Sequence, residues 1–142
     1  MDIRQATSSY EAWMRQRTAV IESDLRDKHR QMRKDPFVFL RGTFYRWVQL
    51  WPELCHDLSR AARVLAVGDL HVGSFGTWRD AEGRLCWGTD DFDECYRLPY
   101  TNDLVRLATS VKLLIDRGEL DLTIRSSEQS AHGGLCRPRE SL

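Results

Sequence analysis

Apolar residues in the first part of the chain recur at a spacing that favours an amphipathic helix. They share one rough face of such a helix: Trp13, Val20, Ile21 and Leu25. Ser8 or Ser9 can cap a helix that begins near Tyr10. The charged segment 26–34 would form its solvated end. Asp35-Pro36 would stop it, because the residue before proline avoids the helical conformation.

Short apolar runs follow, punctuated by proline and glycine. Residues 37–40 form a compact apolar run, and a second amphipathic helix is expected over residues 43–50. Pro52 can occupy the first turn of a short third helix. The apolar residues 64–67 then predict a short buried strand that ends at Gly68.

A hairpin and a long helix complete the pattern. The β-prone runs 75–78 and 85–87 flank the polar segment 79–84, which predicts a β-hairpin. Thr101 or Asn102 can cap a helix that continues to Arg117, with Gly118 as its stop. The apolar residues of this helix recur at helical spacing: Leu104, Leu107, Ala108, Val111, Leu114 and Ile115.

These elements predict an α+β fold that is mostly helical, with one central β-hairpin. We expect one domain over residues 1–125, since a chain of 142 residues suits a single hydrophobic core. From Ser126 onward the apolar pattern is lost. We therefore expect residues 126–142 to be a disordered tail or the product of a changed reading frame.

Composition narrows the class of protein. Apolar residues make up 42% and charged residues 30%, which is typical of a globular protein. The 21 basic residues equal the 21 acidic ones, so net charge gives no reason to expect a nucleic-acid or membrane partner. The first residues lead into a polar stretch without an apolar core, so we expect no signal peptide. No apolar run of this sequence approaches the roughly 20 residues that span a bilayer. A cytoplasmic location is the simplest expectation. The cysteines form no C-x-x-C pair and are expected to be free thiols: Cys55, Cys86, Cys95 and Cys136.

Two acidic segments flank the predicted hairpin. Residues 67–76 place Asp69, His71 and three glycines in the loop between a strand and the hairpin. Residues 90–94 hold four carboxylates at the other end of the hairpin. Each segment alone is more often a turn or a solvated loop. Because a hairpin returns its end to its start, we expect the two loops to be neighbours and to offer oxygen ligands to Mg²⁺.

The order of these motifs resembles the catalytic and metal-binding loops of aminoglycoside-phosphotransferase and protein-kinase-like folds. More closely, the chain resembles the bacterial domain-of-unknown-function 2252 family over roughly residues 30–117. Four spaced motifs carry the resemblance: residues 39–42, 68–76, 91–94 and 102–110. It implies the catalytic half of a kinase-like fold, and ATP- and Mg²⁺-dependent phosphoryl transfer as the activity of the parent protein.

The resemblance also implies roles for individual residues. Asp69 would orient or deprotonate a substrate hydroxyl, and His71 would brace the loop or act in catalysis. Asp91 and Asp93 would hold Mg²⁺ against the phosphates of a nucleotide. Ser74 stands where the pattern has a metal-binding Asn, and its hydroxyl is a poorer ligand for a second metal.

Other residues of the family motifs suggest structural roles. Arg41 could pair with one of the acidic-loop carboxylates or with a helix end, and Asp103 and Arg106 are expected to form an ion pair or anchor a loop. The chain contains neither a Gly-rich phosphate loop nor a following strand with a phosphate-pairing lysine. We therefore expect a C-terminally truncated family member that is inactive alone.

Two alternatives remain open. A non-catalytic remnant or interaction module would expose apolar surface and self-associate through it. A metallophosphoesterase is suggested by residues 68–71 and 116–118, although two-metal hydrolysis needs a fuller set of ligands than these provide.

Overall fold

The computed structural model describes residues 1–120, which begin with two helices rather than one. Helix α1 (Ile3–Arg15) is capped by Asp2, which exchanges hydrogen bonds with Gln5, and helix α2 (Glu22–Lys34) follows. The expectation of one helix from Tyr10 to Lys34 is therefore wrong. Residues 16–21 form the connection between the two helices, and the β-branched pair Val20 and Ile21 lies in it. The predicted stop before Pro36 is confirmed.

Two more helices follow closely. Helix α3 (Pro36–Gly42) is capped by Asp35, whose carboxylate accepts hydrogen bonds from two backbone N–H groups of the first turn. Helix α4 (Phe44–Leu54) continues through Pro52, so the prediction that Pro52 starts a new helix is wrong. Proline removes one helical hydrogen bond, and α4 ends two residues later. A single 3₁₀ turn, η1 (Leu58–Arg60), occupies the place of the expected third helix.

The strands form two separate antiparallel pairs. Strand β1 (Arg63–Ala66) pairs with β4 (Tyr96–Pro99), which the sequence pattern did not reveal. The expected burial of β1 is wrong except at Ala66, since Leu65 is 76% exposed. The predicted hairpin is confirmed: β2 (Phe75–Arg79) pairs with β3 (Leu85–Thr89). A 3₁₀ turn, η2 (Val72–Ser74), leads into β2.

Helix α5 (Tyr100–Asp116) packs against the β1–β4 pair and against α3. The predicted helix and its end are confirmed, and Gly118 follows in a left-handed conformation with φ of 72°. The predicted cap is wrong, because the helix begins at Tyr100 and both Thr101 and Asn102 lie inside it. The buried residues of this helix are polar, however: Thr101, Asn102, Arg106 and Ser110. The predicted apolar stripe is only partly covered, and Leu104 is 57% exposed.

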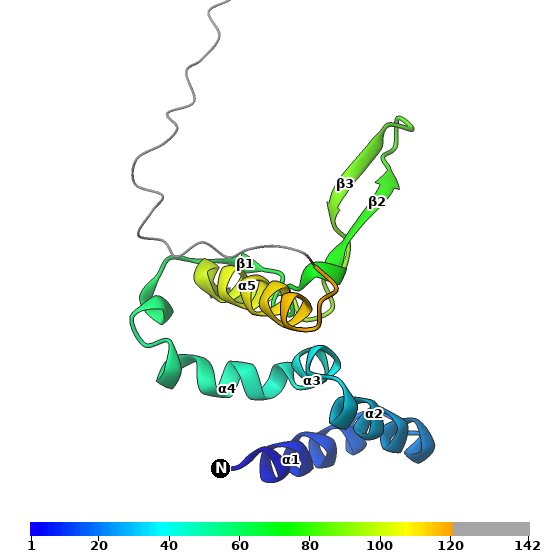
Figure 1. Cartoon of the computed structure of the whole chain (residues 1–142), viewed down its shortest axis with the longest axis vertical. Helices are drawn as coiled ribbons and strands as arrows, with labels where there is room; N and C mark the ends of the chain where they lie inside the picture. Colours follow the sequence, from blue (N-terminus) through cyan, green and yellow to red (C-terminus); the bar gives the residue numbers. More distant parts are fainter. Residues whose placement is uncertain (121–142) are drawn as a thin grey trace, which may run out of the picture.

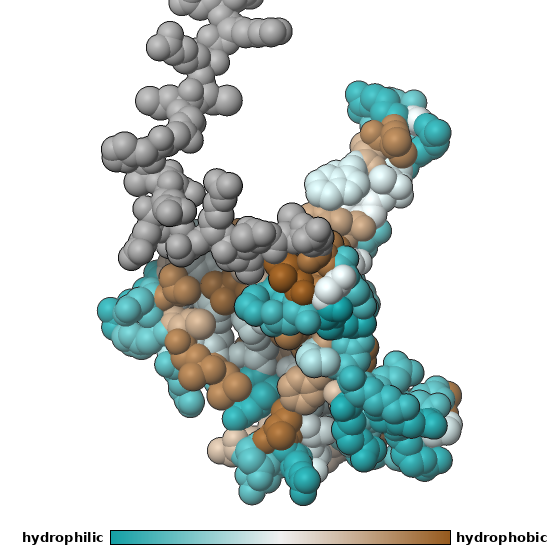
Figure 2. Space-filling model, viewed as in Figure 1, coloured by the Kyte–Doolittle hydropathy of each residue, from teal (hydrophilic) through white to brown (hydrophobic). Residues whose placement is uncertain are grey.

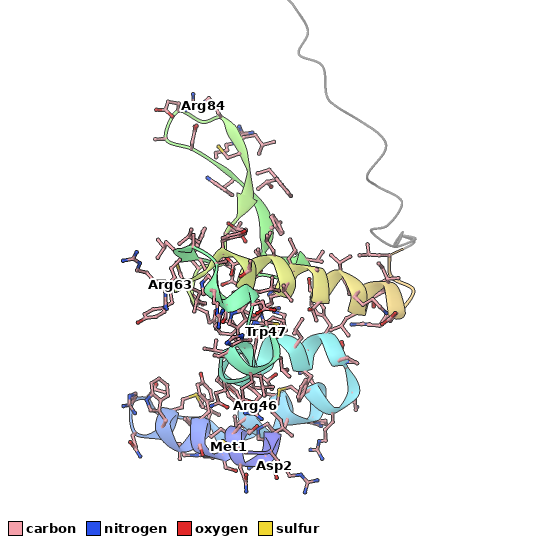
Figure 3. All side chains as sticks on the ribbon, turned by 90° about the vertical axis from the view of Figure 1, so that its left-hand side faces the viewer. Met1, Asp2, Arg46, Trp47, Arg63 and Arg84 are labelled. Carbon is pink, nitrogen blue, oxygen red and sulfur yellow. The ribbon has the colours of Figure 1, made fainter. Side chains whose placement is uncertain are left out.

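The elements lie in three tiers (Figure 1). Helix α5 and the β1–β4 pair lie above α3 and α4, which lie above α1 and α2. The β2–β3 hairpin projects away from the rest as an arm, and its tip is hydrophilic (Figure 2). Figure 3 shows Trp47 of α4 between the tiers and Arg46 beside Met1, whose carbonyl oxygen accepts its hydrogen bond.

The described residues thus form an α+β fold of helices and two small sheets. No helix within residues 1–120 combines the length and the apolar character that crossing a membrane requires. Cys55, Cys86 and Cys95 are free thiols, as expected. The predicted tail at 126–142, with Cys136, lies outside the described residues.

Candidate functional site

The loop after β1 is largely buried within residues 1–120, and its surroundings are polar. Val67 and Gly68 donate their backbone N–H groups to the carboxylate of Asp103, at 2.7 and 3.1 Å. The side-chain amide of Asn102 donates to the Gly68 carbonyl oxygen, and Asn102 Oδ1 accepts from Trp47 Nε1. These hydrogen bonds from the start of α5 fix the conformation of the loop that carries Asp69.

Gly68 brings the two acidic loops into contact. Its φ of 89° lies in the left-handed region, which side chains with a Cβ resist. A Cβ atom at this position would lie 2.3 Å from the backbone oxygen of Glu94. The absence of a side chain therefore lets the backbone of the Asp69 loop touch the backbone of the Asp91 loop.

Asp69 is held by Arg106 from α5. The guanidinium donates from Nε to Asp69 Oδ1 at 2.6 Å and also from Nη2, which additionally reaches the Leu40 carbonyl oxygen. The Arg106 side chain is fully buried and the Asp69 side chain is 9% exposed. Burial raises the pKa of Asp69 to about 6, although the charge and hydrogen bonds of Arg106 act in the opposite direction.

His71 and Ser74 support the loop from inside. The Ser74 hydroxyl accepts from the His71 backbone N–H and donates to the Asp69 carbonyl oxygen. The His71 ring is buried with its edge toward Phe37, and neither ring nitrogen has a hydrogen-bond partner within residues 1–120. Burial, followed by the Arg41 charge, lowers the pKa of His71 to about 4.

A pocket of about 530 Å³ opens beside the Asp69 loop. Its carboxylates come from both acidic loops: Asp69, Asp91, Asp93 and Glu94. We call it the acidic pocket. Three of the predicted site residues, Asp69, Asp91 and Asp93, thus line one cavity. His71 and Ser74 are not among the lining residues, and Ser74 is fully buried among backbone groups.

The acidic pocket also contains two basic residues. Lys28 from α2 and Arg41 from α3 line it, and Arg41 Nη2 lies 3.9 Å from Asp91 Oδ2. Burial, with the nearby charges of Asp91 and Asp93, raises the pKa of Glu94. Glu94 belongs to the acidic segment 90–94 that the sequence singled out, whereas Lys28 was not predicted as a site residue. Lys28 lies in a charged helix end that resembles an ordinary solvated surface, so no local signal distinguishes it.

The four carboxylates of this pocket are not grouped closely enough to form a complete metal cage made of protein ligands alone. Within residues 1–120 there is no group of three or more His, Cys, Asp or Glu side chains placed to hold a metal ion. Mg²⁺ does not need one, because it commonly binds through one or two carboxylates, several waters and the phosphates of a substrate. Asp91 and Asp93 are the residues that could hold such an ion.

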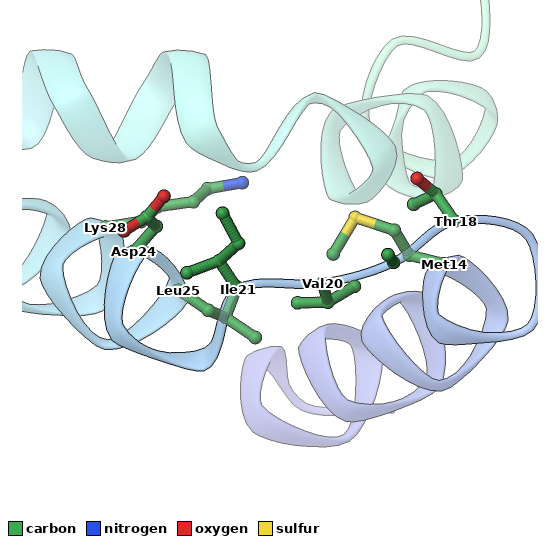
Figure 4. Close-up of a pocket in the computed structure, with 8 residues that line it drawn as sticks. Met14, Thr18, Val20, Ile21, Asp24, Leu25 and Lys28 are labelled. Carbon is green, nitrogen blue, oxygen red and sulfur yellow. The ribbon is translucent and has the colours of Figure 1, made fainter.

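The two segments that suggested a metallophosphoesterase, residues 68–71 and 116–118, do not line the acidic pocket together. Asp116 lies at the end of α5, where it pairs with Lys112, and it does not line the acidic pocket. A further pocket of about 350 Å³ lies where α1 gives way to α2 (Figure 4). Its wall is largely apolar, with Asp24 and Lys28 as its charged residues.

Comparison with known proteins gives one family. A family model described as "Uncharacterized protein conserved in bacteria (DUF2252)" matches residues 15–124, which include the whole acidic pocket. Comparison with curated proteins and with solved structures gives no match.

Proposed function

The chain belongs to the DUF2252 family of uncharacterized proteins conserved in bacteria, and we propose that its acidic pocket is the carboxylate part of a Mg²⁺-dependent phosphoryl-transfer site. One observation carries the proposal: Asp69 and Asp91, from two separate loops, line the same pocket. The resemblance of these loops to the catalytic and metal-binding loops of kinase-like folds supports it. Phosphoryl transfer depends mainly on positioning and on charge neutralisation, which such a pair of loops can provide.

Asp69 is suited to accept a proton. Arg106 donates to Oδ1, and Oδ2 accepts no hydrogen bond within residues 1–120, so Oδ2 is available to a substrate hydroxyl. The pKa of Asp69, about 6, lies closer to neutral pH than that of an ordinary aspartate. A general base works best when its pKa is near the pH of the reaction. As the hydroxyl oxygen bonds to phosphorus and the leaving oxygen departs, the hydroxyl proton passes to Asp69.

Asp91 and Asp93 would hold the metal ion. Bound Mg²⁺ would neutralise charge on the phosphates that approach the pocket. His71 contributes to the site indirectly, because its buried ring packs against Phe37 of α3 and does not line the pocket. Ser74 serves the loop backbone through its hydrogen bonds, so we assign it no metal.

Binding is the property to test, since the sequence lacks a Gly-rich phosphate loop and its lysine. We expect the chain to bind Mg²⁺·ATP without appreciable turnover. Isothermal titration calorimetry should show that Asp91→Asn removes the Mg²⁺-dependent part of the affinity. Asp57→Asn is the matched control, because the Asp57 side chain is 97% exposed and lies outside the acidic pocket. Unchanged Mg²⁺-dependent affinity in Asp91→Asn would contradict the proposal.

A second candidate, a non-catalytic interaction module, is favoured by the β2–β3 arm. The arm exposes large apolar side chains: Trp78 at 43%, Leu85 at 69% and Trp87 at 70%. Leu85 and Trp87 share one face of the ribbon, and Trp78 lies on the other, since paired residues point to the same side. Large apolar side chains exposed in this way commonly mark interaction surfaces. The two candidates make different predictions, since an interaction module would need no Mg²⁺.

A further inference from the structure

The acidic pocket adjoins a second pocket of different character. The second has a volume of about 350 Å³ and shares Lys28, Arg41, Gly42 and Glu94 with the first. Its remaining wall is aromatic and apolar: Tyr10, Phe44, Tyr45 and Val48. We call it the aromatic pocket. Two basic side chains therefore lie on the border between a wall of carboxylates and a wall of aromatic rings.

Gly42 makes this border possible. A Cβ atom there would lie 3.2 Å from Lys28 Cε and 2.6 Å from Met32 Sδ. Because α3 ends in a residue without a side chain, the stem of Lys28 passes beside it and reaches both pockets. Lys28 is thus positioned by close packing although its ammonium group is accessible.

The two cations are available to an anionic ligand. Lys28 forms no ion pair within residues 1–120. Arg41 has one long contact, to Asp91 at 3.9 Å, and its side chain is 49% exposed, so that pair contributes little. A lone phosphate would be repelled by the four carboxylates of the acidic pocket. A phosphate that arrives with a divalent cation would be attracted by both sets of charges.

We propose that the two pockets form one composite site for a phosphorylated ligand that carries a flat aromatic group. Lys28 and Arg41 hold the phosphate at the shared border, and the aromatic group lies against the rings of the aromatic pocket. Tyr10 and Tyr45 stack on each other there with ring centroids 4.3 Å apart, which orders this aromatic wall before a ligand binds. The inference rests on the proposed function for the metal, whereas the phosphate and ring contacts are new.

Two probes separate the contributions of the two pockets. Mg²⁺·pyrophosphate has the diphosphate alone, and Mg²⁺·ADP adds an aromatic nucleoside. Isothermal titration calorimetry on the full chain should give an affinity for Mg²⁺·ADP at least about tenfold higher than for Mg²⁺·pyrophosphate. Equal affinities for the two probes would overturn the assignment of the aromatic pocket.

Substitutions then locate each contact. Lys28→Met keeps an unbranched side chain beside Gly42 and removes the charge. It should lower the affinity for both probes by about tenfold. Lys34→Met, on the same helix but in neither pocket, should leave the affinity for both probes unchanged. Val48→Trp fills the aromatic pocket at a residue that is 38% exposed. It should lower the affinity for Mg²⁺·ADP and leave the affinity for Mg²⁺·pyrophosphate unchanged. Thermal melts monitored by circular dichroism establish that each variant is folded.

The outcomes distinguish this inference from the proposed function. If Asp91→Asn abolishes Mg²⁺-dependent binding while Lys28→Met behaves like Lys34→Met, the composite site is wrong and the metal site stands. If the wild-type chain binds neither probe with Mg²⁺, both are wrong.

Discussion

At the scale of single residues, Arg106 is the side chain on which the candidate site depends. It is fully buried, pairs with Asp69 and lies over the rings of Phe44 and Trp47 at 4.8 and 4.9 Å. A buried pair of this kind adds little net stability, but removal of one partner leaves an uncompensated charge at a cost of about 3–5 kcal/mol. Arg106 is therefore a positioning residue, and Asp69 keeps its orientation because Arg106 is present.

Gly68 permits a direct test of the contact between the acidic loops. Gly68→Ala should destabilise the protein through both its φ of 89° and the approach of the Cβ atom to the Glu94 oxygen. Gly83→Ala is the matched control, with a φ of 79° and no atom within 4 Å of its Cβ position. We expect the control to lose about 1 kcal/mol of unfolding free energy, because alanine resists the left-handed backbone conformation. The loss at Gly68 should exceed it by at least about 1 kcal/mol, because the backbone must move. Urea unfolding measures both, and equal losses would mean that the loops are not in contact.

At the scale of elements, the sequence correctly predicted the features that depend on residues close together in the chain. The hairpin followed from two β-prone runs around a polar turn, and the end of α2 followed from Asp35-Pro36. Strand β4 could not be predicted in this way, because its pairing with β1 joins residues thirty or more positions apart. The proximity of the acidic loops was predicted, since the hairpin returns the chain to its start.

Helix α5 shows why the burial of its polar face was missed, although Asp103 and Arg106 were expected to form an ion pair or to anchor a loop. Its apolar periodicity predicted an apolar buried face, yet the buried side is polar: Asn102, Arg106 and Ser110. These residues are spaced four apart and share a helical face as regularly as the leucines do. They are buried because the Asp69 loop supplies their hydrogen-bond partners. The spacing of apolar residues gives no information about such partners, so it could not predict the burial of this polar face.

The β2–β3 arm is the element from which we expect self-association. Phe75 and Trp87 stack with ring centroids 5.1 Å apart, but Trp87 remains 70% exposed, and a two-stranded ribbon alone is marginally stable. Trp87→Ser should reduce the apparent molecular mass in size-exclusion chromatography with light scattering at about 100 µM, a concentration that reveals micromolar association. Trp13→Ser, at a residue of α1 that is 49% exposed, should not. A monomeric wild-type chain at this concentration would contradict the expectation.

At the scale of the whole molecule, the described residues have a small apolar core around a polar centre. The buried apolar residues are few: Ala6, Leu25, Trp51, Ala66 and Leu70. The largest fully buried side chains are Arg106, His71 and Asn102, which all contact or adjoin the Asp69 loop. Buried polar networks contribute less to stability than to a unique arrangement of groups, which suits a structure organised around a site.

The central claim is that the two acidic loops form one metal–phosphate pocket, and paramagnetic Mn²⁺ tests it most directly. Mn²⁺ added with pyrophosphate to the ¹⁵N-labelled chain should broaden the backbone amide signals of residues 68–70 and 91–94 together. Signals from the arm tip around Gly83 should persist, and Asp91→Asn should abolish the broadening. Broadening of only one loop, or strongest broadening elsewhere, would contradict the account.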